Sequence, residues 1–259
     1  MDSKVERQRE HFDSIADEYL EARLNATHRD LKKRIWSAFS ANKKALLASG
    51  ARVLEPMCGM AEGLEIVETY FQSEIDYLGF DYSEKMVAAA RRRLPKHQIE
   101  WADVTVFDPK DKQYDFIVLL GGLHHVYAVS DKVVMRLADS LAPGGYFLSY
   151  EPTQNCWLTR KIREKIYSAN PTFDHKTEQG FDLEQLNTMF RQAGFDLIDQ
   201  AYPGLLSYIL YYNPDAFPWL NKGGVPGVKA AFSIDRLFWR NWIGRKLSFA
   251  TLSLWRKRV

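Results

Sequence analysis

The chain has 259 residues, of which 46% are hydrophobic and 26% charged, and this composition excludes a disordered or low-complexity protein. Two cysteines, Cys58 and Cys156, are too few for a disulfide framework, and no apolar run is long enough to cross a membrane. The N-terminus is charged and lacks the apolar segment of a signal peptide, so we expect a cytoplasmic protein.

The net charge of +2 hides an uneven distribution. Residues 232–259 contain seven basic side chains, one acidic side chain and six aromatic ones. A basic, aromatic region can contact anionic lipid or nucleic acid. The alternative is a packed helix and strand whose basic residues are solvated, and the sequence leaves both interpretations open.

The predicted elements alternate between strands and helices after an all-helical start. Helical spacing of apolar residues predicts two helices, at 4–24 and 28–48. Short apolar runs then predict strands at 51–55, 75–80, 97–102, 114–120, 146–151, 195–199 and 248–255. Helices are predicted between them at 61–71, from the cap Ser83 to Arg93, from the cap Ser130 over 131–141, and from Asp182 to just before Gly194. The sequence "LAPGG" is predicted to break the chain before the fifth strand.

Repeated strand–helix units predict an α/β fold with a doubly wound, mostly parallel seven-stranded sheet covered by helices on both faces. We expect one domain with four parts: N-terminal helices (1–48), a core (49–202), an insertion (203–247) and a last strand (248–259). The insertion is rich in Tyr, Trp, Pro and Gly. Ile234, Leu237, Phe238 and Trp242 in it have helical spacing. We interpret this face either as a wall for an apolar ligand or as a dimer interface or additional core.

Acidic residues follow three successive predicted strands. Glu55 ends the first strand in "VLEPMCGMAEG", Asp81 ends the second and Asp103 follows the third. In a parallel sheet, ligands bind beyond the carboxyl ends of the strands, where a carboxylate can accept hydrogen bonds from ribose hydroxyls. Gly59 in the first loop lets the backbone approach a ligand closely. The pattern therefore predicts a nucleoside-containing cofactor along this edge of the sheet.

Five ordered motifs carry a resemblance to a known family. They are "VLEPMCGMAEG", "YLGFDYSEKMVAAARRR", "WADVTVFD", "YDFIVLLGGLHHV" and "LAPGGYFLSYEP". Together they resemble the class I S-adenosylmethionine-dependent methyltransferases, in particular the small-molecule group that includes ubiquinone-biosynthesis-like enzymes. The resemblance covers about residues 10–200 and the last strand. It implies the Rossmann-like methyltransferase fold, an N-terminal helical lid, S-adenosylmethionine as cofactor and S-adenosylhomocysteine as product.

The resemblance also implies roles for individual residues. The expected cofactor-binding residues are Tyr19, Glu55, Met57, Gly59, Asp81, Tyr82, Met86, Asp103, Val104 and Leu120. His124 and His125 are the candidate catalytic residues, either of which could act as a general base or only line the pocket. Tyr127 and Glu151 are expected on the acceptor side, and Glu151 has the alternative of pairing with a nearby base. No metal site is expected, because adjacent histidines rarely ligate one metal ion alone.

The first motif departs from the family pattern at two positions. Met57 and Ala61 stand where the family commonly has glycines. The same departure disfavours a dehydrogenase, whose pyrophosphate needs a glycine-rich turn at a helix N-terminus.

The function expected is methyl transfer to a small molecule, more at oxygen than at nitrogen or carbon, on an apolar, aromatic, lipid-like or natural-product acceptor. The alternative is a non-catalytic protein of the same fold that binds the cofactor or assists assembly. A nucleic-acid methyltransferase is disfavoured. No NPPY-type motif of the base-amino methyltransferases follows the fourth strand, and its absence leaves other nucleic-acid methyltransferases open. Peripheral membrane contact through the basic C-terminal region and a homodimer are further expectations.

Overall fold

The structure is a computed structural model that describes residues 24–259 except 45, 73, 109–112, 170–178 and 215–216. At its centre lies a seven-stranded sheet with the order β3-β2-β1-β4-β5-β7-β6. The strands are β1 (Ala51–Pro56), β2 (Ile75–Asp81), β3 (Gln98–Trp101), β4 (Tyr114–Leu120), β5 (Leu141–Pro152), β6 (Phe195–Ala201) and β7 (Ala250–Lys257). Strands β1 to β5 pair in parallel, whereas β7 runs antiparallel to both of its neighbours. This topology confirms the predicted doubly wound, mostly parallel sheet.

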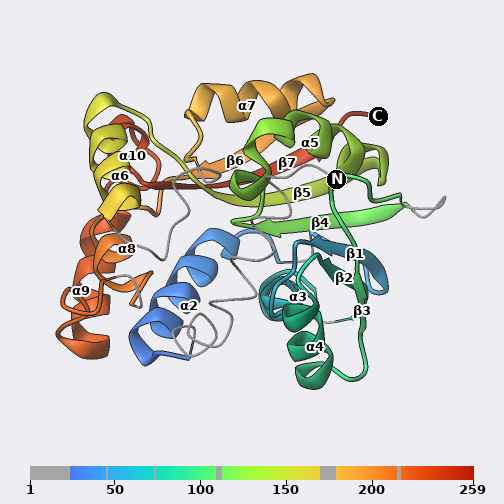
Figure 1. Cartoon of the computed structure of the whole chain (residues 1–259), viewed down its shortest axis with the longest axis horizontal. Coiled ribbons are helices and arrows are strands. Elements are labelled where there is room, and N and C mark those ends of the chain that lie inside the picture. The colour runs from blue at the N-terminus through green and yellow to red at the C-terminus, as the bar shows by residue number, and fades with distance from the viewer. Residues whose placement is uncertain (1–23, 45, 73, 109–112, 170–178, 215–216) are drawn as a thin grey trace.

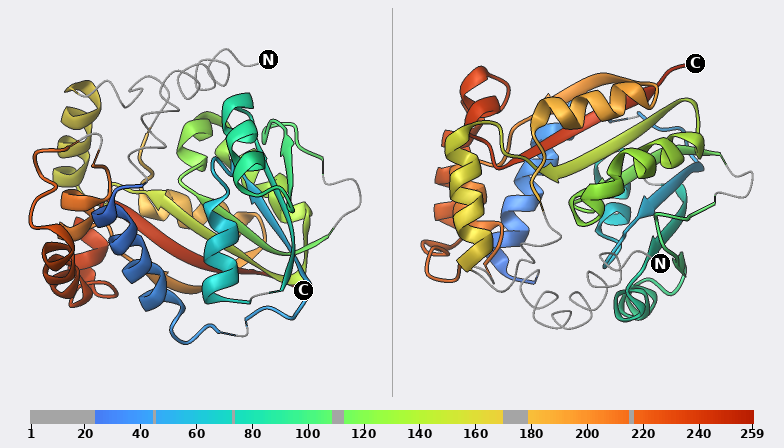
Figure 2. Two further views of the ribbon diagram at one scale, coloured as in Figure 1. Left: turned by 90° about the horizontal axis from the view of Figure 1, so that it is seen from below. Right: turned by 45° about the horizontal axis from the view of Figure 1, so that its top comes forward.

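Helices cover both faces of the sheet (Figure 1). On one face lie α2 (Ala26–Ser40), α3 (Glu62–Tyr70) and α4 (Glu84–Arg93), and on the other lie α5 (Ser130–Asp139) and α7 (Leu183–Gln192). The 3-10 helix η1 (Leu123–Val129) joins β4 to α5. The remaining described helices, α6 (Trp157–Ala169), α8 (Leu206–Tyr211), α9 (Gly224–Arg236) and α10 (Trp242–Leu247), gather at one end of the molecule in every view (Figures 1 and 2).

Strand β4 shows why the sheet needs helices on both faces. Phe116 and Val118 pack into the core beneath α2 and α3, whereas Ile117 and Leu119 pack into the core beneath α5 and α7. Because successive strand side chains point to opposite faces, a continuous apolar run is stable only when both faces are covered. On the second face the Trp255 ring of β7 stacks on Phe190 of α7 at 4.8 Å.

Side-chain caps mark the starts of α4 and α7. The Ser83 hydroxyl accepts a hydrogen bond from the Met86 N–H, and the Asp182 carboxylate accepts from the Glu184 and Gln185 N–H groups. Both caps were predicted from the sequence. Gly194, at φ 87°, follows α7 where a left-handed residue ends the helix.

Three expectations about elements differ from the structure. Ser130 is the first residue of α5 rather than its cap, and its hydroxyl donates to the Tyr127 carbonyl, because η1 occupies the residues before it. The sequence "LAPGG" begins β5 instead of breaking the chain, with the pairing to β4 shifted next to it. The predicted helix 28–48 ends at Ser40, and the predicted helix 4–24 lies outside the described residues. No helix among the described residues has both the length and the apolar character needed to cross a membrane.

Candidate active site

The predicted site residues in the described part of the chain lie at the carboxyl ends of β1 to β5 and in the segments that directly follow them, which include η1 and the first turn of α4. Parallel pairing brings these ends together at one edge of the sheet, although the residues are up to a hundred positions apart in sequence. Tyr19 lies outside the described residues, so its expected contact with the cofactor stays a prediction.

Glu55 at the end of β1 is turned into the protein. Its side chain is buried, and its carboxylate accepts hydrogen bonds from the Gly63 N–H at 2.9 Å and the Leu64 N–H at 3.2 Å, at the N-terminus of α3. The Tyr77 hydroxyl donates to the same carboxylate at 2.5 Å. Burial raises the pKa of Glu55 to about 7, and the hydrogen bonds from Tyr77 and Gly63 oppose that rise. Two of the N–H groups at this helix N-terminus are therefore bound by the chain itself.

The loop between β1 and α3 takes its shape from alternate left-handed residues. Met57 has φ 53°, Gly59 has φ 51° and Ala61 has φ 57°. This conformation suits glycine and costs an L-residue roughly 1–2 kcal/mol. The two departures from the family pattern therefore stand at backbone positions of the kind that favour glycine. Met57 packs towards Gly122, and a Cβ on Gly59 would meet no atom within 4 Å, so that side of the loop is open.

Asp81 at the end of β2 is held beside this loop. Its two carboxylate oxygens accept hydrogen bonds from the Gly59 N–H at 2.8 Å and the Ser83 N–H at 2.9 Å. The half-buried carboxylate is thus fixed in direction before any ligand binds. Tyr82, the next residue, stacks on the Trp101 ring at 5.7 Å. Together they form an acidic and aromatic rim after β2.

The other four predicted cofactor residues surround the same edge. Met86 and Val104 are buried, and Leu120 is half-buried at the end of β4. Asp103 is half-buried and accepts hydrogen bonds from the Thr105 N–H and hydroxyl through one oxygen, Oδ1, each at 2.8 Å. Asp103 therefore forms its own turn with one oxygen.

A second buried carboxylate, Glu151 of β5, faces the loop after β4. Its Oε1 atom accepts hydrogen bonds from the Gly122 and Leu123 N–H groups, both at 3.0 Å. Its Oε2 atom lies 3.2 Å from His124 Nδ1. Burial raises the pKa of Glu151 to about 8, and burial together with the nearby Arg163 charge lowers the pKa of His124 to about 3. Burial thus favours the neutral form of both side chains, which are joined by one hydrogen bond.

The remaining two predicted residues of this region lie beside that pair. The His125 ring lies 3.8 Å from the His124 ring, measured between centroids. Tyr127 instead reaches towards α7, where its hydroxyl donates to Gln185 Oε1 at 2.9 Å. Within the described part of the chain, no three His, Cys, Asp or Glu side chains are grouped so that they could hold a metal ion.

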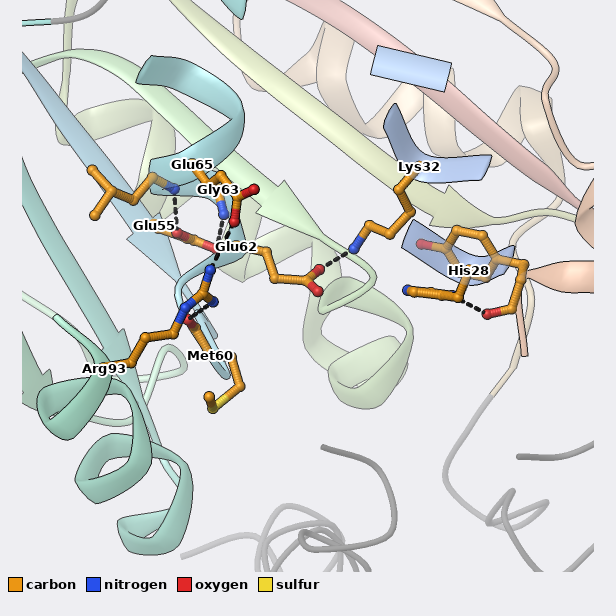
Figure 3. A network of polar contacts seen from close by, with 10 residues as sticks. His28, Lys32, Glu55, Met60, Glu62, Gly63, Glu65 and Arg93 are labelled. Carbon is orange, nitrogen blue, oxygen red and sulfur yellow. Dashed lines mark hydrogen bonds and ion pairs between the residues drawn. The ribbon is translucent and has the colours of Figure 1, made fainter. Parts of the chain in front are cut away.

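Two basic residues that the sequence did not single out contact the loop between β1 and α3 from neighbouring helices (Figure 3). Lys32 of α2 forms an ion pair with Glu62 at the start of α3. Arg93 of α4 donates to the Met60 carbonyl at 3.0 Å and to the Glu65 carboxylate at 2.7 Å. Each pair joins residues about thirty positions apart, so no local pattern in the sequence signals it.

The contacts of Glu55, Gly59 and Asp81 indicate which class of cofactor fits at the carboxyl ends of the strands. A pyrophosphate requires free N–H groups at a helix N-terminus, and Glu55 already binds those of α3. The open side of Gly59 and the fixed Asp81 carboxylate instead suit a nucleoside whose ribose donates hydrogen bonds. The residues present therefore fit S-adenosylmethionine, which carries no phosphate, better than a dinucleotide.

Comparisons with known proteins agree with this geometry. The sequence profile of a family described as "Methyltransferase domain" matches residues 20–200. A trans-aconitate 2-methyltransferase of Variovorax paradoxus is 30% identical over 194 residues, which is 74% of this chain and 73% of that protein. A demethylmenaquinone methyltransferase of Lactiplantibacillus plantarum is 24% identical over 213 residues, covering 71% of this chain and 85% of that one.

A solved structure has the same fold. It is phosphoethanolamine N-methyltransferase 2 of Haemonchus contortus in complex with S-adenosyl-L-methionine, with a TM-score of 0.58 and 18% identity. The match covers 82% of this chain and 50% of that chain.

We expect Ala61→Gly to raise the free energy of unfolding by roughly 0.5–1 kcal/mol, because glycine adopts the left-handed conformation without strain. Urea denaturation of the purified protein measures this change. Ala88→Gly, at an exposed site in the middle of α4, is the matched control and should lower the same quantity by about 1 kcal/mol. If both variants lowered the free energy of unfolding by the same amount, the backbone at Ala61 would not be strained.

We expect Glu55→Gln to become relatively more stable than the wild type as the pH rises from 5 to 8. The folded pKa of Glu55 is raised from 4.5 to about 7, so its contribution is complete below 4.5 and is lost as the pH rises through this window. The difference in unfolding free energy between the two proteins should change by on the order of 3 kcal/mol across that range. Glu68→Gln, at an exposed residue of α3, should show no such slope in parallel denaturation experiments.

Proposed function

Because the chain belongs to the class I S-adenosylmethionine-dependent methyltransferases, we propose that its site methylates a hydroxyl oxygen of a small, apolar acceptor. The observation that carries the choice of oxygen is the buried pair His124–Glu151. A hydroxyl acceptor must lose a proton on methylation, and a positioned side-chain base speeds that loss.

We assign cofactor contacts to the residues around Gly59 and Asp81. Asp81 accepts hydrogen bonds from the ribose hydroxyls, because the Gly59 and Ser83 N–H groups fix its carboxylate at the end of β2. Tyr82, Met86, Val104 and Leu120 contribute apolar surface beside it, and Met57 and Asp103 complete the edge. We propose that Glu55 acts at one remove: its buried carboxylate shapes the loop through its hydrogen bonds to the Gly63 and Leu64 N–H groups.

When bound, S-adenosylmethionine would supply an activated methyl group, and its sulfur would keep the electron pair of the broken bond. His124 accepts the proton of the acceptor hydroxyl as the new carbon–oxygen bond forms. Its Nδ1 atom faces Glu151, which leaves Nε2 as the ring nitrogen for the acceptor. Glu151 is a positioning residue, since its oxygens are directed to His124 and to the backbone after β4.

The ionisation of Glu151 controls which nitrogen of His124 carries the proton. A protonated Glu151 donates to Nδ1 and so places the ring proton on Nε2, which then cannot accept another. When Glu151 ionises, near its raised pKa of about 8, Nδ1 donates to the carboxylate and Nε2 becomes an acceptor. The base-competent form therefore accumulates as the pH rises.

Aromatic side chains near the end of β5 support an apolar acceptor. Tyr150 lies in edge contact with Trp36 of α2 at 6.0 Å and with Tyr212, just after α8, at 5.7 Å. Tyr212 also stacks on Tyr208 at 4.4 Å. We propose that the segment between β6 and β7, which contains α8, covers the acceptor. The similar demethylmenaquinone methyltransferase is named for a quinone acceptor, which is consistent with this class.

A non-catalytic protein that only binds the cofactor is the second candidate. This candidate arises because Met57 and Ala61 replace glycines that the family commonly has in the cofactor loop. Both residues nevertheless adopt the left-handed backbone conformation that glycine would adopt there. The two cysteines form no disulfide, which supports our proposal of a cytoplasmic location.

We expect Asp81→Asn to weaken binding of S-adenosylhomocysteine by roughly 10-fold to 100-fold, since a charge-assisted hydrogen bond contributes about 1.5–3 kcal/mol. Isothermal titration calorimetry measures the dissociation constant. Asp76→Asn, exposed at the other end of β2, is the control and should bind as the wild type does. Unchanged affinity in Asp81→Asn would remove Asp81 from the cofactor site.

We expect Glu151→Gln to lower the rate of methyl transfer by about 100-fold or more while leaving cofactor affinity unchanged. The glutamine oxygen can still accept the hydrogen bonds from the Gly122 and Leu123 N–H groups. Its NH2 group then faces His124 and donates to Nδ1, so the ring proton stays on Nε2. The assay uses S-adenosylmethionine with a labelled methyl group at saturating concentration and an organic-solvent extract of cells as the source of acceptor. It measures the rate at which label enters the extracted compounds.

The wild-type rate should rise with pH through about 8, and the variant should lose this rise. Calorimetry with S-adenosylhomocysteine reports whether the variant is folded. A Glu151→Gln variant with the wild-type rate and pH profile would contradict base catalysis by His124. Transfer to nitrogen or carbon in the labelled product would contradict the choice of oxygen.

A further inference from the structure

Helices α6, α8, α9 and α10 gather at one end of the molecule (Figure 2), and exposed apolar side chains concentrate on them and on the segments between them. Of the seventeen large apolar side chains exposed in the described part of the chain, eleven lie there. They are Trp157, Leu158 and Ile162 of α6, Leu206 and Ile209 of α8, Trp219, Val225, Ile234, Leu237, and Trp242 and Leu247 of α10. Trp157 is 76% exposed and Trp242 is 73% exposed. Exposed apolar surface of this extent marks an interaction site.

The same end is strongly basic. Residues 157–165 and 203–247 contain ten Lys and Arg residues and three Asp and Glu residues. The acidic residue Asp235 is buried, where its carboxylate accepts hydrogen bonds from the Leu206 and Ser207 N–H groups and joins α9 to α8. In contrast, Lys229 and Lys246 are exposed and form no ion pair among the residues that the structure describes. The Asp235 carboxylate is thus turned inward, whereas Glu164 is exposed beside Lys161 and both lysines face outward.

Hydrogen bonds fix α6 against α10. The Asn155 side chain, two residues before Trp157, donates to the Arg245 carbonyl at 2.7 Å. The buried Arg163 guanidinium of α6 donates to the Phe249 carbonyl at 2.5 Å, just beyond α10. Helices α6 and α10 are therefore held together, and we call the exposed residues of α6, α8, α9 and α10 and of the segments between α8 and α10 the basic apolar face.

We propose that the basic apolar face docks on an anionic lipid bilayer. Exposed tryptophans suit the interfacial region of a membrane, and lysines among them are attracted to anionic headgroups. Aliphatic side chains such as Leu158, Ile162 and Leu247 contribute nothing to binding a phosphodiester backbone, so nucleic acid fits less well. A second copy of the chain also fits less well, because lysine is depleted at protein interfaces.

This placement orients the active site towards the membrane. Strand β5, which carries Glu151, leads through residues 153–156 directly into α6 and Trp157. The basic apolar face therefore adjoins the acceptor side of the site. The docking itself does not depend on the proposed methyl acceptor, and it is tested without methyl transfer.

The test is co-sedimentation of the full-length protein with vesicles of phosphatidylcholine alone or of phosphatidylcholine mixed with phosphatidylglycerol. We expect binding to the anionic vesicles only, weakened by salt. The double variant Lys229→Glu, Lys246→Glu should bind at least about tenfold more weakly. The control is the double variant Arg92→Glu, Lys96→Glu, which makes the same change in net charge at two exposed residues, one in α4 and one just after it. It should bind as the wild type does.

A second pair of variants tests the apolar contribution. Trp157→Ser with Trp242→Ser should lose most of the binding, whereas Met135→Ser, at an exposed apolar residue of α5, should retain it. Unchanged affinity for S-adenosylhomocysteine shows that each variant is folded.

Equal loss in both charge variants would overturn the proposal, because binding would then follow net charge rather than this face. Absence of binding to either vesicle would also overturn it. So would a dimer in light scattering that the tryptophan variants dissociate, or duplex DNA binding that the Lys229→Glu, Lys246→Glu variant abolishes while vesicles stay unbound.

Discussion

The hydrogen bonds between the Glu55 carboxylate and the N-terminus of α3 are the constraint on which the cofactor edge depends. They bind the N–H groups of Gly63 and Leu64, which a phosphate would otherwise use. They also explain why residue 63 is glycine: a Cβ there would lie 2.6 Å from the Glu55 carboxyl carbon. The choice of a phosphate-free cofactor therefore follows from a contact within the protein as much as from a contact with the ligand.

The loop between Glu55 and Gly63 keeps a glycine-type backbone with two residues that are not glycine. Met57 and Ala61 are left-handed, and the strain of that conformation must be offset by the contacts around the loop. Glu55 holds it from inside, and Arg93 and Lys32 hold it from α4 and α2 (Figure 3). The side chain of Met57 gains packing against Gly122, which lies in the loop after β4. The cofactor loop and the loop that carries His124 are thereby in direct contact.

Glu151 repeats the arrangement of Glu55 on a neighbouring part of the sheet. Each is a buried carboxylate near the end of a strand, and each accepts hydrogen bonds from two consecutive N–H groups of another loop or helix. The remaining partner differs: a tyrosine hydroxyl for Glu55 and a histidine ring for Glu151. The first arrangement shapes a loop, and the second sets the direction and protonation of His124. On this edge of the sheet, the same buried group serves structure in one place and, as we propose, proton transfer in the other.

The sequence by itself determined the sheet, since the apolar run of β4 and the alternation of strands and helices leave few other folds. It also placed Asp81, Gly59 and His124 at strand ends, because that prediction needs only local pattern and parallel pairing. It assigned Glu55 to the cofactor and Glu151 to the acceptor side, but it could not identify their hydrogen-bond partners, which lie 8 to 29 positions away and are fixed only when the strands pair. The outward face of α6 and α10 was equally undetermined, because helical spacing marks an apolar stripe without saying what covers it. Tertiary structure decided these points, since burial and hydrogen bonding depend on which residues folding brings together.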